Sequence, residues 1–204
     1  MRLKTISLDL GDTLIYNEPW GYEVISNALK DLGYKIPAKK IFRAAARIRG
    51  RKITPNPNGN NTPSLREIFN ELGLNLSDEE IEYVEKVRKS TEKRVYLYED
   101  VIDFLELVKS MGLRTVLISN AAVNGNAKRH VEEFGLKKYF DKLIFSFEVG
   151  YVKPDPRIFK LAIQDVEAVH IGDIYEVDVL GAINAGFKGI LLDRRSAYDD
   201  ISPR

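Results

Sequence analysis

Residues 3–13, LKTISLDLGDT, decide the fold class, because a short apolar strand runs directly into a polar turn. The apolar run over 3–8 predicts a strand that ends at Asp9, and residues 11–13 carry a turn signal. After about residue 97 the same texture returns, and helical segments alternate with the apolar runs 115–118, 143–145, 168–171 and 189–192. Short apolar strands that alternate with helices are typical of βαβ units. The sequence therefore predicts an α/β fold, a Rossmann-like parallel sheet with helices on both faces.

Between the first strand and residue 97 the sequence is helical and charged instead. Two capping boxes each mark the start of a helix, Ser64 with Glu67 and Ser77 with Glu80. In such a box the serine side chain and the glutamate side chain satisfy free backbone N–H groups at the helix start. This part of the chain is therefore expected to be helical rather than part of the sheet.

The interruption of the α/β pattern sets the expected domain organisation. The length of 204 residues, at about 150 residues per domain, suits one domain with a subdomain. Asn and Pro dominate residues 55–63, which are expected to form a loop. We expect a core formed by residues 1–15 and 97–204, with an α-helical cap over 16–96 inserted after the first strand.

Composition excludes several classes of protein. The 31 basic and 30 acidic residues leave a net charge of +1, so nucleic acid is not an expected partner. No stretch approaches the roughly 18 apolar residues of a membrane span, so a membrane is not expected either. The chain contains no cysteine, which removes disulfides and thiolate chemistry and suits a cytoplasmic protein.

Polar side chains follow the predicted strands at the points where these strands end. They are Asp9, the pair Ser119 and Asn120, Lys153 and Asp173. Ligands of open α/β sheets bind outside the carboxyl ends of the strands, so we expect these groups to converge on one crevice. Two carboxylates could share Mg²⁺ with a substrate phosphate, and one of them could attack as a nucleophile. An ammonium group there would neutralise the developing phosphoryl charge, and a hydroxyl would donate to a phosphate oxygen.

These residues lie in four motifs that resemble, in order, those of the haloacid dehalogenase (HAD) superfamily. The motifs are 8–14, LDLGDTL; 118–120, ISN; 150–159, GYVKPDPRIF; and 170–186, which begins HIGD. The resemblance implies that Asp9 is the nucleophile and a metal ligand. It implies that the carbonyl of Gly11 and the carboxylate of Asp173 complete the Mg²⁺ site, while Asp178 orders a ligand water. The expected substrate is a small phosphorylated molecule.

The first motif departs from the family pattern at two adjacent positions. The family reads Asp-x-Asp-Gly-Thr, and this chain has Gly11 followed by Asp12 instead. The resemblance implies that Gly11 keeps the carbonyl ligand but lacks the carboxylate that serves as general acid and base. General acid–base catalysis contributes about 10²–10⁴ in rate, so the exchange predicts slow turnover of phosphate esters. Asp12 is either a partial replacement for that acid or a turn residue hydrogen-bonded to backbone.

The sequence is compatible with four hypotheses for the function. The first is a Mg²⁺-dependent phosphatase that forms an aspartyl-phosphate on Asp9. A 2-haloacid dehalogenase lacks the second aspartate but also lacks a metal. A phosphonatase keeps Mg²⁺ but needs a Schiff-base lysine from the cap, for which Lys39 or Lys52 could serve. The last is a degenerate module that binds without turnover.

Three further features have both a structural and a functional reading. His170 lies on a strand and is expected to be packed, whereas His130 lies on a helix and is expected at the surface. Residues 36–52 contain seven basic residues and no acidic one. Four of the cations recur every four residues and so share one helix face, namely Lys39, Arg43, Arg47 and Arg51. That face is expected to be solvated or paired with partner groups, and the alternative is that it meets an anionic substrate or a nucleic acid.

Overall fold

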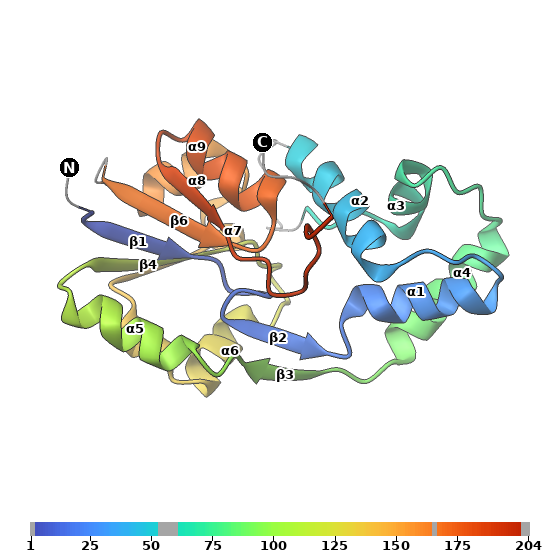
Figure 1. The fold of residues 1–204 in the computed structure, drawn as a ribbon, viewed down its shortest axis with the longest axis horizontal. Coiled ribbons are helices and arrows are strands. Elements are labelled where there is room, and N and C mark those ends of the chain that lie inside the picture. Colours follow the sequence, from blue (N-terminus) through green and yellow to red (C-terminus); the bar gives the residue numbers. More distant parts are fainter. Residues whose placement is uncertain (1–2, 53–60, 165–166, 201–204) are drawn as a thin grey trace.

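The computed structural model describes residues 3–52, 61–164 and 167–200. In this part of the chain the main sheet has five parallel strands in the order β5-β4-β1-β6-β7 (Figure 1). The strands are β1 (Thr5–Leu8), β4 (Arg114–Ser119), β5 (Lys142–Phe145), β6 (Ala168–Gly172) and β7 (Lys188–Leu191). Leu8 lies opposite Leu117 and Ile171, so the three central strands end at the same level.

Helices cover both faces of this sheet. Helices α5 (Val101–Ser110) and α6 (Ala127–Glu133) lie on one face, and α8 (Pro156–Ala162) and α9 (Leu180–Asn184) lie on the other (Figure 1). Along β4, Leu117 packs with α5, whereas Val116 and Ile118 pack with α8, because successive strand side chains point to opposite faces. The remaining short turns are α7 (Ser146–Val149), a 3₁₀ helix (Leu136–Tyr139) and a π-helix (Tyr175–Val179). The predicted α/β fold class is confirmed.

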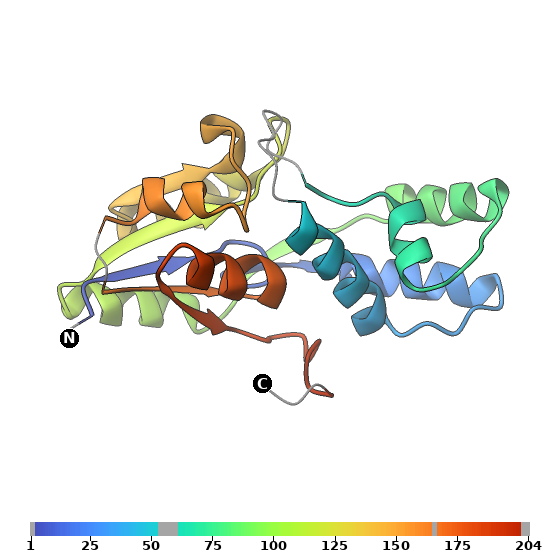
Figure 2. The ribbon, with the colours of Figure 1, turned by 90° about the horizontal axis from the view of Figure 1, so that it is seen from above.

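Four helices lie to one side of the sheet, beyond the carboxyl ends of its strands (Figure 2). They are α1 (Gly21–Asp31), α2 (Ala38–Arg51), α3 (Leu65–Glu71) and α4 (Asp78–Ser90). Both expected capping boxes are present, at the start of α3 and of α4. The four helices bury an apolar cluster of their own, which includes Leu29, Ile41, Phe69 and Val84. Of the loop expected over 55–63, residues 55–60 lie outside the described residues.

An antiparallel ribbon links the two parts, and the sequence did not predict it. Strand β2 (Ile15–Glu18) pairs with β3 (Arg94–Leu97), where helical structure was expected up to residue 96. Tyr16 lies opposite Tyr96, and their rings stack with centroids 5.5 Å apart. Each strand has only four residues and pairs with a segment far along the chain, so neither carries a strong local signal.

The C-terminal segment 193–200 crosses from the sheet to α2. Lys39 bonds Asp199 at 2.8 Å, and Arg43 forms an ion pair with Asp200. Arg47 and Arg51, further along α2, both pair with Glu71 of α3. The basic face of α2 is therefore paired within the protein, as the structural reading expected. None of the described helices has the length and apolar character needed to span a bilayer.

Candidate active site

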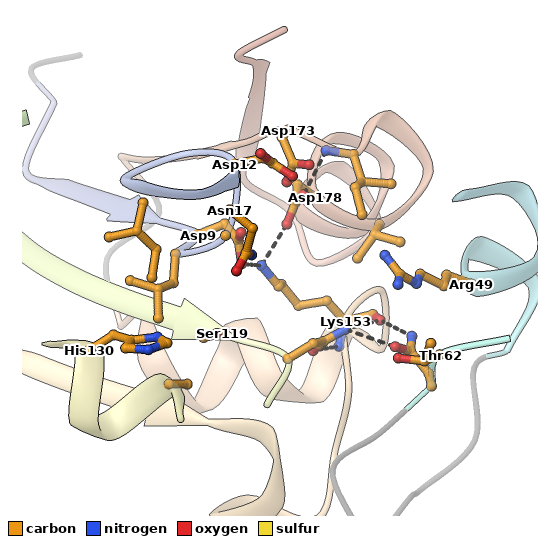
Figure 3. A pocket seen from close by; sticks show the side chains of 18 of the residues that line it. Asp9, Asp12, Asn17, Arg49, Thr62, Ser119, His130, Lys153, Asp173 and Asp178 are labelled. Atoms are coloured by element: carbon orange, nitrogen blue, oxygen red, sulfur yellow. Dashed lines mark hydrogen bonds and ion pairs between the residues drawn. The ribbon is translucent and has the colours of Figure 1, made fainter. Parts of the chain in front are cut away.

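A cavity of about 460 Å³ lies at the carboxyl ends of the central strands (Figure 3). Its lining includes every residue singled out from the sequence as a site residue: Asp9, Gly11, Asp12, Ser119, Asn120, Lys153, Asp173 and Asp178. Asp9 and Asp173 directly follow β1 and β6, and Ser119 is the last residue of β4. β1 lies between β4 and β6, so the chain reverses its strand order beside β1, which is where open α/β sheets bind ligands.

Lys153 forms the electrostatic centre of this pocket. Its Nζ donates to Oδ1 of Asp9 and to Oδ1 of Asp178, each at 2.6 Å (Figure 3). The side chain is only 1% exposed. Burial alone would lower the pKa of Lys153, but the carboxylates of Asp178 and Asp9 outweigh it and raise the pKa to about 12. Lys153 is therefore a fixed positive charge beside the expected nucleophile.

Two asparagines hold the backbone of Lys153. Asn120 accepts from Lys153 N at 2.8 Å through Oδ1 and donates to Lys153 O at 2.9 Å through Nδ2. Asn61, from the segment before α3, donates to the same carbonyl at 3.0 Å. Asn120 thus acts by positioning the lysine. Ser119 is buried beside it, and its hydroxyl bonds no described residue, so it remains free to donate to a ligand.

The carboxylates of Asp9 and Asp173 are buried and lie near other negative charges. Burial raises the pKa of Asp9 to about 6, with Lys153 opposing the rise and Asp178 adding to it. Burial and repulsion from Asp9 and Asp178 raise the pKa of Asp173 well above its ordinary value. The Asp173 carboxylate makes no hydrogen bond or ion pair within the described part of the chain. A cation between these groups would relieve the repulsion.

The donor set suits Mg²⁺. Across residues 3–52, 61–164 and 167–200 there is no group of three His, Cys, Asp or Glu side chains placed to hold one ion. The expected set needs only two such side chains, Asp9 and Asp173, together with the carbonyl of Gly11. Mg²⁺ usually keeps several waters and takes one or two protein carboxylates plus substrate oxygens, so these residues fit it.

Asp178 is held on both oxygens by the protein. Oδ1 takes hydrogen bonds from Lys153 and, at 3.2 Å, from Nε2 of His170, and Oδ2 accepts from Ile174 N at 3.0 Å. Burial would raise the pKa of Asp178, but Lys153 and His170 hold it below its ordinary value. A Cβ on Gly172 would lie 2.3 Å from Asp178 Cγ, so glycine is required there for the close approach. Asp178 therefore orients Lys153.

The two histidines of the chain differ in how their burial compares with the sequence-based expectation. His170 is fully buried, as expected, with Nδ1 2.8 Å from Ser7 Oγ, and burial lowers its pKa to about 4. The imidazole is neutral and supports Asp178. His130, expected at the surface, is half-buried and lines the active-site pocket, a role that the sequence did not indicate (Figure 3). An amphipathic helix gives no signal for which of its edges faces a cavity.

Asp12 has the backbone of a turn residue, with φ at 50°. Its Oδ2 accepts from Trp20 Nε1 at 3.2 Å and its Oδ1 from Arg195 Nε at 3.0 Å. Burial raises the pKa of Asp12, and Arg195 opposes the rise. The Asp12 carboxylate thus bonds the side chains of Trp20 and Arg195, and not the local backbone that was expected. Gly11 has no left-handed backbone, and a Cβ there would meet nothing within 4 Å.

The helical segment adds residues that the sequence did not single out. Arg49 reaches from α2 into the pocket, and Thr62 lies beside the backbone of Lys153 (Figure 3). Tyr22, Phe42 and Asn61 also line the pocket. Lys39 and Lys52, considered above as Schiff-base lysines, are absent from the described lining. They pair instead with Asp199 and Glu67, each at 2.8 Å. Among the described lining residues the only lysine is Lys153, so nothing there favours a phosphonatase.

Comparison with known proteins agrees with this geometry. The family model of the haloacid dehalogenase-like hydrolases matches residues 3–186. A phosphoserine phosphatase of Thermus thermophilus is 29% identical over 233 aligned positions, which cover 97% of this chain and 92% of that protein. A glyceraldehyde 3-phosphate phosphatase of Methanopyrus kandleri is 33% identical over 115 residues, 52% of this chain, and the match spans only 47% of that relative. The crystal structure of a HAD phosphatase from Thermococcus onnurineus has the same fold, with a TM-score of 0.56, 23% identity, and coverage of 95% of this chain and 87% of that one.

Proposed function

Because the chain belongs to the haloacid dehalogenase-like hydrolases, we propose that it is a Mg²⁺-dependent phosphatase of small phosphate monoesters. The observation that carries this proposal is the buried contact of Lys153 with Asp9 at 2.6 Å, beside the crowded carboxylate of Asp173. A phosphoryl group is the ligand that such a site suits, since Lys153 and a cation would balance its charge. The phosphatase names of the curated relatives support the same substrate class.

In the proposed reaction, a carboxylate oxygen of Asp9 attacks phosphorus while the P–O bond to the ester oxygen breaks, and the alkoxide that leaves takes its proton from solvent water. Lys153 keeps Asp9 ionised and neutralises the charge that develops on the phosphoryl oxygens. Ser119 donates its hydroxyl to one of those oxygens. Water then attacks the aspartyl-phosphate, which releases inorganic phosphate and restores the carboxylate.

A divalent cation supplies charge neutralisation of the transferred phosphate in this site. Asp9, Asp173 and the carbonyl of Gly11 would hold it, and Asp178 would act through Lys153 and through an ordered water. The leaving alcohol receives no proton from the side chain of residue 11, which is glycine. Asp12 does not replace that acid in this proposal, because Trp20 and Arg195 engage both of its oxygens.

We also propose the division into a core, residues 1–15 and 97–204, and an α-helical cap, residues 16–96. Its support is that α1–α4 bury a separate apolar cluster and contribute Arg49 and Asn61 to the pocket. Because that helical segment forms one wall of the pocket, it would select the substrate.

Phosphate release from p-nitrophenyl phosphate and from a set of phosphorylated metabolites tests the proposal. We expect Mg²⁺-dependent activity that EDTA abolishes and added Mg²⁺ restores. Asp9→Asn is expected to fold normally and to lose essentially all turnover, since an amide does not attack phosphorus. Ser110→Ala, on the exposed face of α5, is the matched control.

Two results would contradict the proposal. Activity that survives EDTA, accompanied by chloride release from 2-chloropropionate, would show a 2-haloacid dehalogenase instead. More than a few per cent of wild-type phosphatase activity in Asp9→Asn would show that Asp9 is not the nucleophile.

A further inference from the structure

A second cavity, of about 400 Å³, lies within the helical segment beside the active-site pocket. Helices α1, α3 and α4 contribute to its lining, which includes the apolar side chains of Ile25, Leu65, Ile68 and Ile81. Tyr22, Arg49 and Thr62 line both cavities. The two spaces therefore meet at Arg49, whose side chain Figure 3 shows directed toward the active-site pocket.

The described lining of this cavity carries more positive than negative charge. Its cations are Arg49, Arg66, Arg88 and Lys93, and its one carboxylate is Glu85. Arg88 bonds Glu85 at 2.7 Å, and Arg66 pairs with Asp78 outside the cavity. Arg49 and Lys93 make no hydrogen bond or ion pair with any described residue, and the Nε of Arg49 is buried without a partner. Buried donors without partners are costly unless a ligand satisfies them.

The surroundings of Lys93 destabilise its charged ammonium group when no ligand is bound. A Cβ on Gly21 would lie 3.2 Å from Lys93 Nζ, so the ammonium is beside the first residue of α1. The N-terminus of a helix is electropositive, and Trp20 provides no side-chain cap there. Burial and the nearby Arg88 lower the pKa of Lys93. An ammonium, a guanidinium and a helix N-terminus thus share one cavity, an arrangement that an anion stabilises.

We infer that this cavity binds a second anionic group of the substrate, held by Lys93 and the N-terminus of α1, with Arg49 between it and the active site. The substrate class is a phosphate monoester that carries a carboxylate or a second phosphate several bonds from the reacting phosphorus. The inference rests on the proposed function, since it places the reacting phosphate at Asp9. The apolar part of the lining would contact the chain that joins the two anionic groups.

A series of ω-carboxyalkyl phosphates, compared with ω-hydroxyalkyl phosphates of the same chain length, tests this inference. A third arm uses alkanediol bisphosphates and distinguishes a carboxylate from a phosphate as the second group. The readout is the ratio of kcat/KM for the anionic and the neutral substrate at each length. We expect a ratio of about 10 or more at an optimal length, because the second anion would gain hydrogen bonds from charged donors, which are stronger than those of neutral pairs.

The variant Lys93→Met is expected to bring that ratio toward 1, and Arg49→Gln to lower it as well. Lys86→Met is the matched control, because it makes the same change on α4 at an exposed lysine outside the described lining of both cavities. In that variant the ratio is expected to stay at its wild-type value. Circular dichroism and thermal unfolding verify that each variant folds.

Binding measured without turnover keeps the test independent of the proposed function. By calorimetry, ω-carboxyalkylphosphonates are expected to bind the wild-type protein about tenfold more tightly than ω-hydroxyalkylphosphonates, and Lys93→Met to abolish the difference. Equal binding of the two series at every length overturns the inference, and so does a preference that Lys93→Met leaves intact. Absence of turnover on every phosphate ester, with the binding preference present, would instead contradict the proposed function.

Discussion

Because Gly11 and Asp12 are exchanged relative to the family pattern, the left-handed position of the turn, residue 12, carries a side chain. Asp12 has φ at 50°, whereas Gly11 is not left-handed and has open space where a Cβ would lie. Asp is among the few non-glycine residues that accept this conformation. The bonds from Trp20 and Arg195 hold its carboxylate in place. We therefore expect the exchange to change the free energy of unfolding little and to slow the protonation of the leaving group.

Reversing the exchange is expected to restore a general acid. In the double variant Gly11→Asp, Asp12→Gly, the new side chain enters open space and glycine takes the left-handed position. Turnover of ethyl phosphate is expected to rise about 10- to 10³-fold, within what general acid catalysis supplies. Turnover of p-nitrophenyl phosphate, whose leaving group needs little protonation, should rise much less. Equal gains for both substrates would show that the barrier does not lie in leaving-group protonation.

The variant Asp12→Asn separates the two roles considered for Asp12. Asparagine tolerates the left-handed backbone and keeps one carbonyl oxygen as an acceptor. We expect kcat for ethyl phosphate and for p-nitrophenyl phosphate to stay within about threefold of wild type, because Trp20 and Arg195 engage both carboxylate oxygens of Asp12 and leave it no part in proton transfer. Steady-state kinetics on both substrates measure this. A loss confined to ethyl phosphate would identify Asp12 as the acid.

At the residue scale, the sequence predicts the groups that follow strands and misses those that arrive from elsewhere. Asp9, Ser119 and Asp173 were placed together because parallel strands end at one edge of a sheet. Arg195 contacts Asp12 across 183 positions of the chain, and no local pattern indicates such a pair. The same holds for Arg49: its helix was recognisable as basic, but Arg49 does not lie on the face that Arg43 and Arg47 share, and no local pattern shows that it lines the pocket.

At the scale of single elements, capping chemistry was the most predictable feature. The boxes at Ser64 and Ser77 have both reciprocal hydrogen bonds. Helix α8 begins differently, with Asp155 accepting from Arg157 N at 2.9 Å and Pro156 as its first residue. Asp155 is almost fully buried and also binds the guanidinium of Arg157. This cap lies two residues after Lys153, so it fixes the segment that presents the lysine to the site.

The charge of Asp155 is expected to make the start of α8 sensitive to acid. The hydrogen bonds from Arg157 lower the pKa of Asp155 in the folded protein. A lowered folded-state pKa stabilises the fold above the unfolded-state pKa, near about 3.9, and this contribution disappears as the pH falls through the folded value. Asp155→Asn keeps an acceptor for the cap but loses the charge. We expect it to lower the free energy of unfolding by about 1 kcal/mol at pH 7, because the hydrogen bonds from Arg157 lose their charge assistance.

Urea unfolding of wild type and Asp155→Asn at pH 7, 5 and 3 measures that difference. Other groups titrate in both proteins, so their contributions to the free energy of unfolding cancel in the difference. The difference should persist at pH 5 and be smaller at pH 3, because the contribution falls as the pH drops below the unfolded-state pKa. A difference of constant size at all three pH values would mean that the charge of Asp155 contributes nothing.

At the scale of the whole molecule, the helical segment contacts the sheet through α2 and the C-terminal segment. Trp20 and Phe42 pack with Val177 of the π-helix and with Ala197. The ion pairs of α2 with the C-terminal segment lie beside this apolar contact. The sequence predicted that most of this segment would be helical, but it gave no signal for this packing, because no local pattern marks the few side chains that meet between the helical segment and the sheet. These pairs, together with those of Arg47 and Arg51 with Glu71, occupy the basic face for which nucleic acid was the alternative.

Gly50 permits the closest approach between α2 and the π-helix. A Cβ at this position would lie 2.7 Å from Glu176 Cβ, a distance that forces one element to move. Glycine-to-alanine changes inside helices usually stabilise by up to about 1 kcal/mol. Gly50→Ala is expected to destabilise instead, by about 1–3 kcal/mol, because overpacking shifts the backbone. Arg49 precedes Gly50 and lines the pocket, so the shift should also raise KM.

A double-mutant cycle with Glu176→Gly assigns this effect to the contact. Removing the Cβ of Glu176 takes away the clash, so Gly50→Ala in that background should recover the usual stabilisation of alanine over glycine. Urea unfolding gives the four free energies, and kinetics on p-nitrophenyl phosphate give the KM values. If Gly50→Ala stabilises the wild-type protein and leaves KM unchanged, α2 can move away from the π-helix at no cost. The position of the helical segment over the site would then be set by the β2–β3 ribbon and the C-terminal ion pairs, and not by close packing at Gly50.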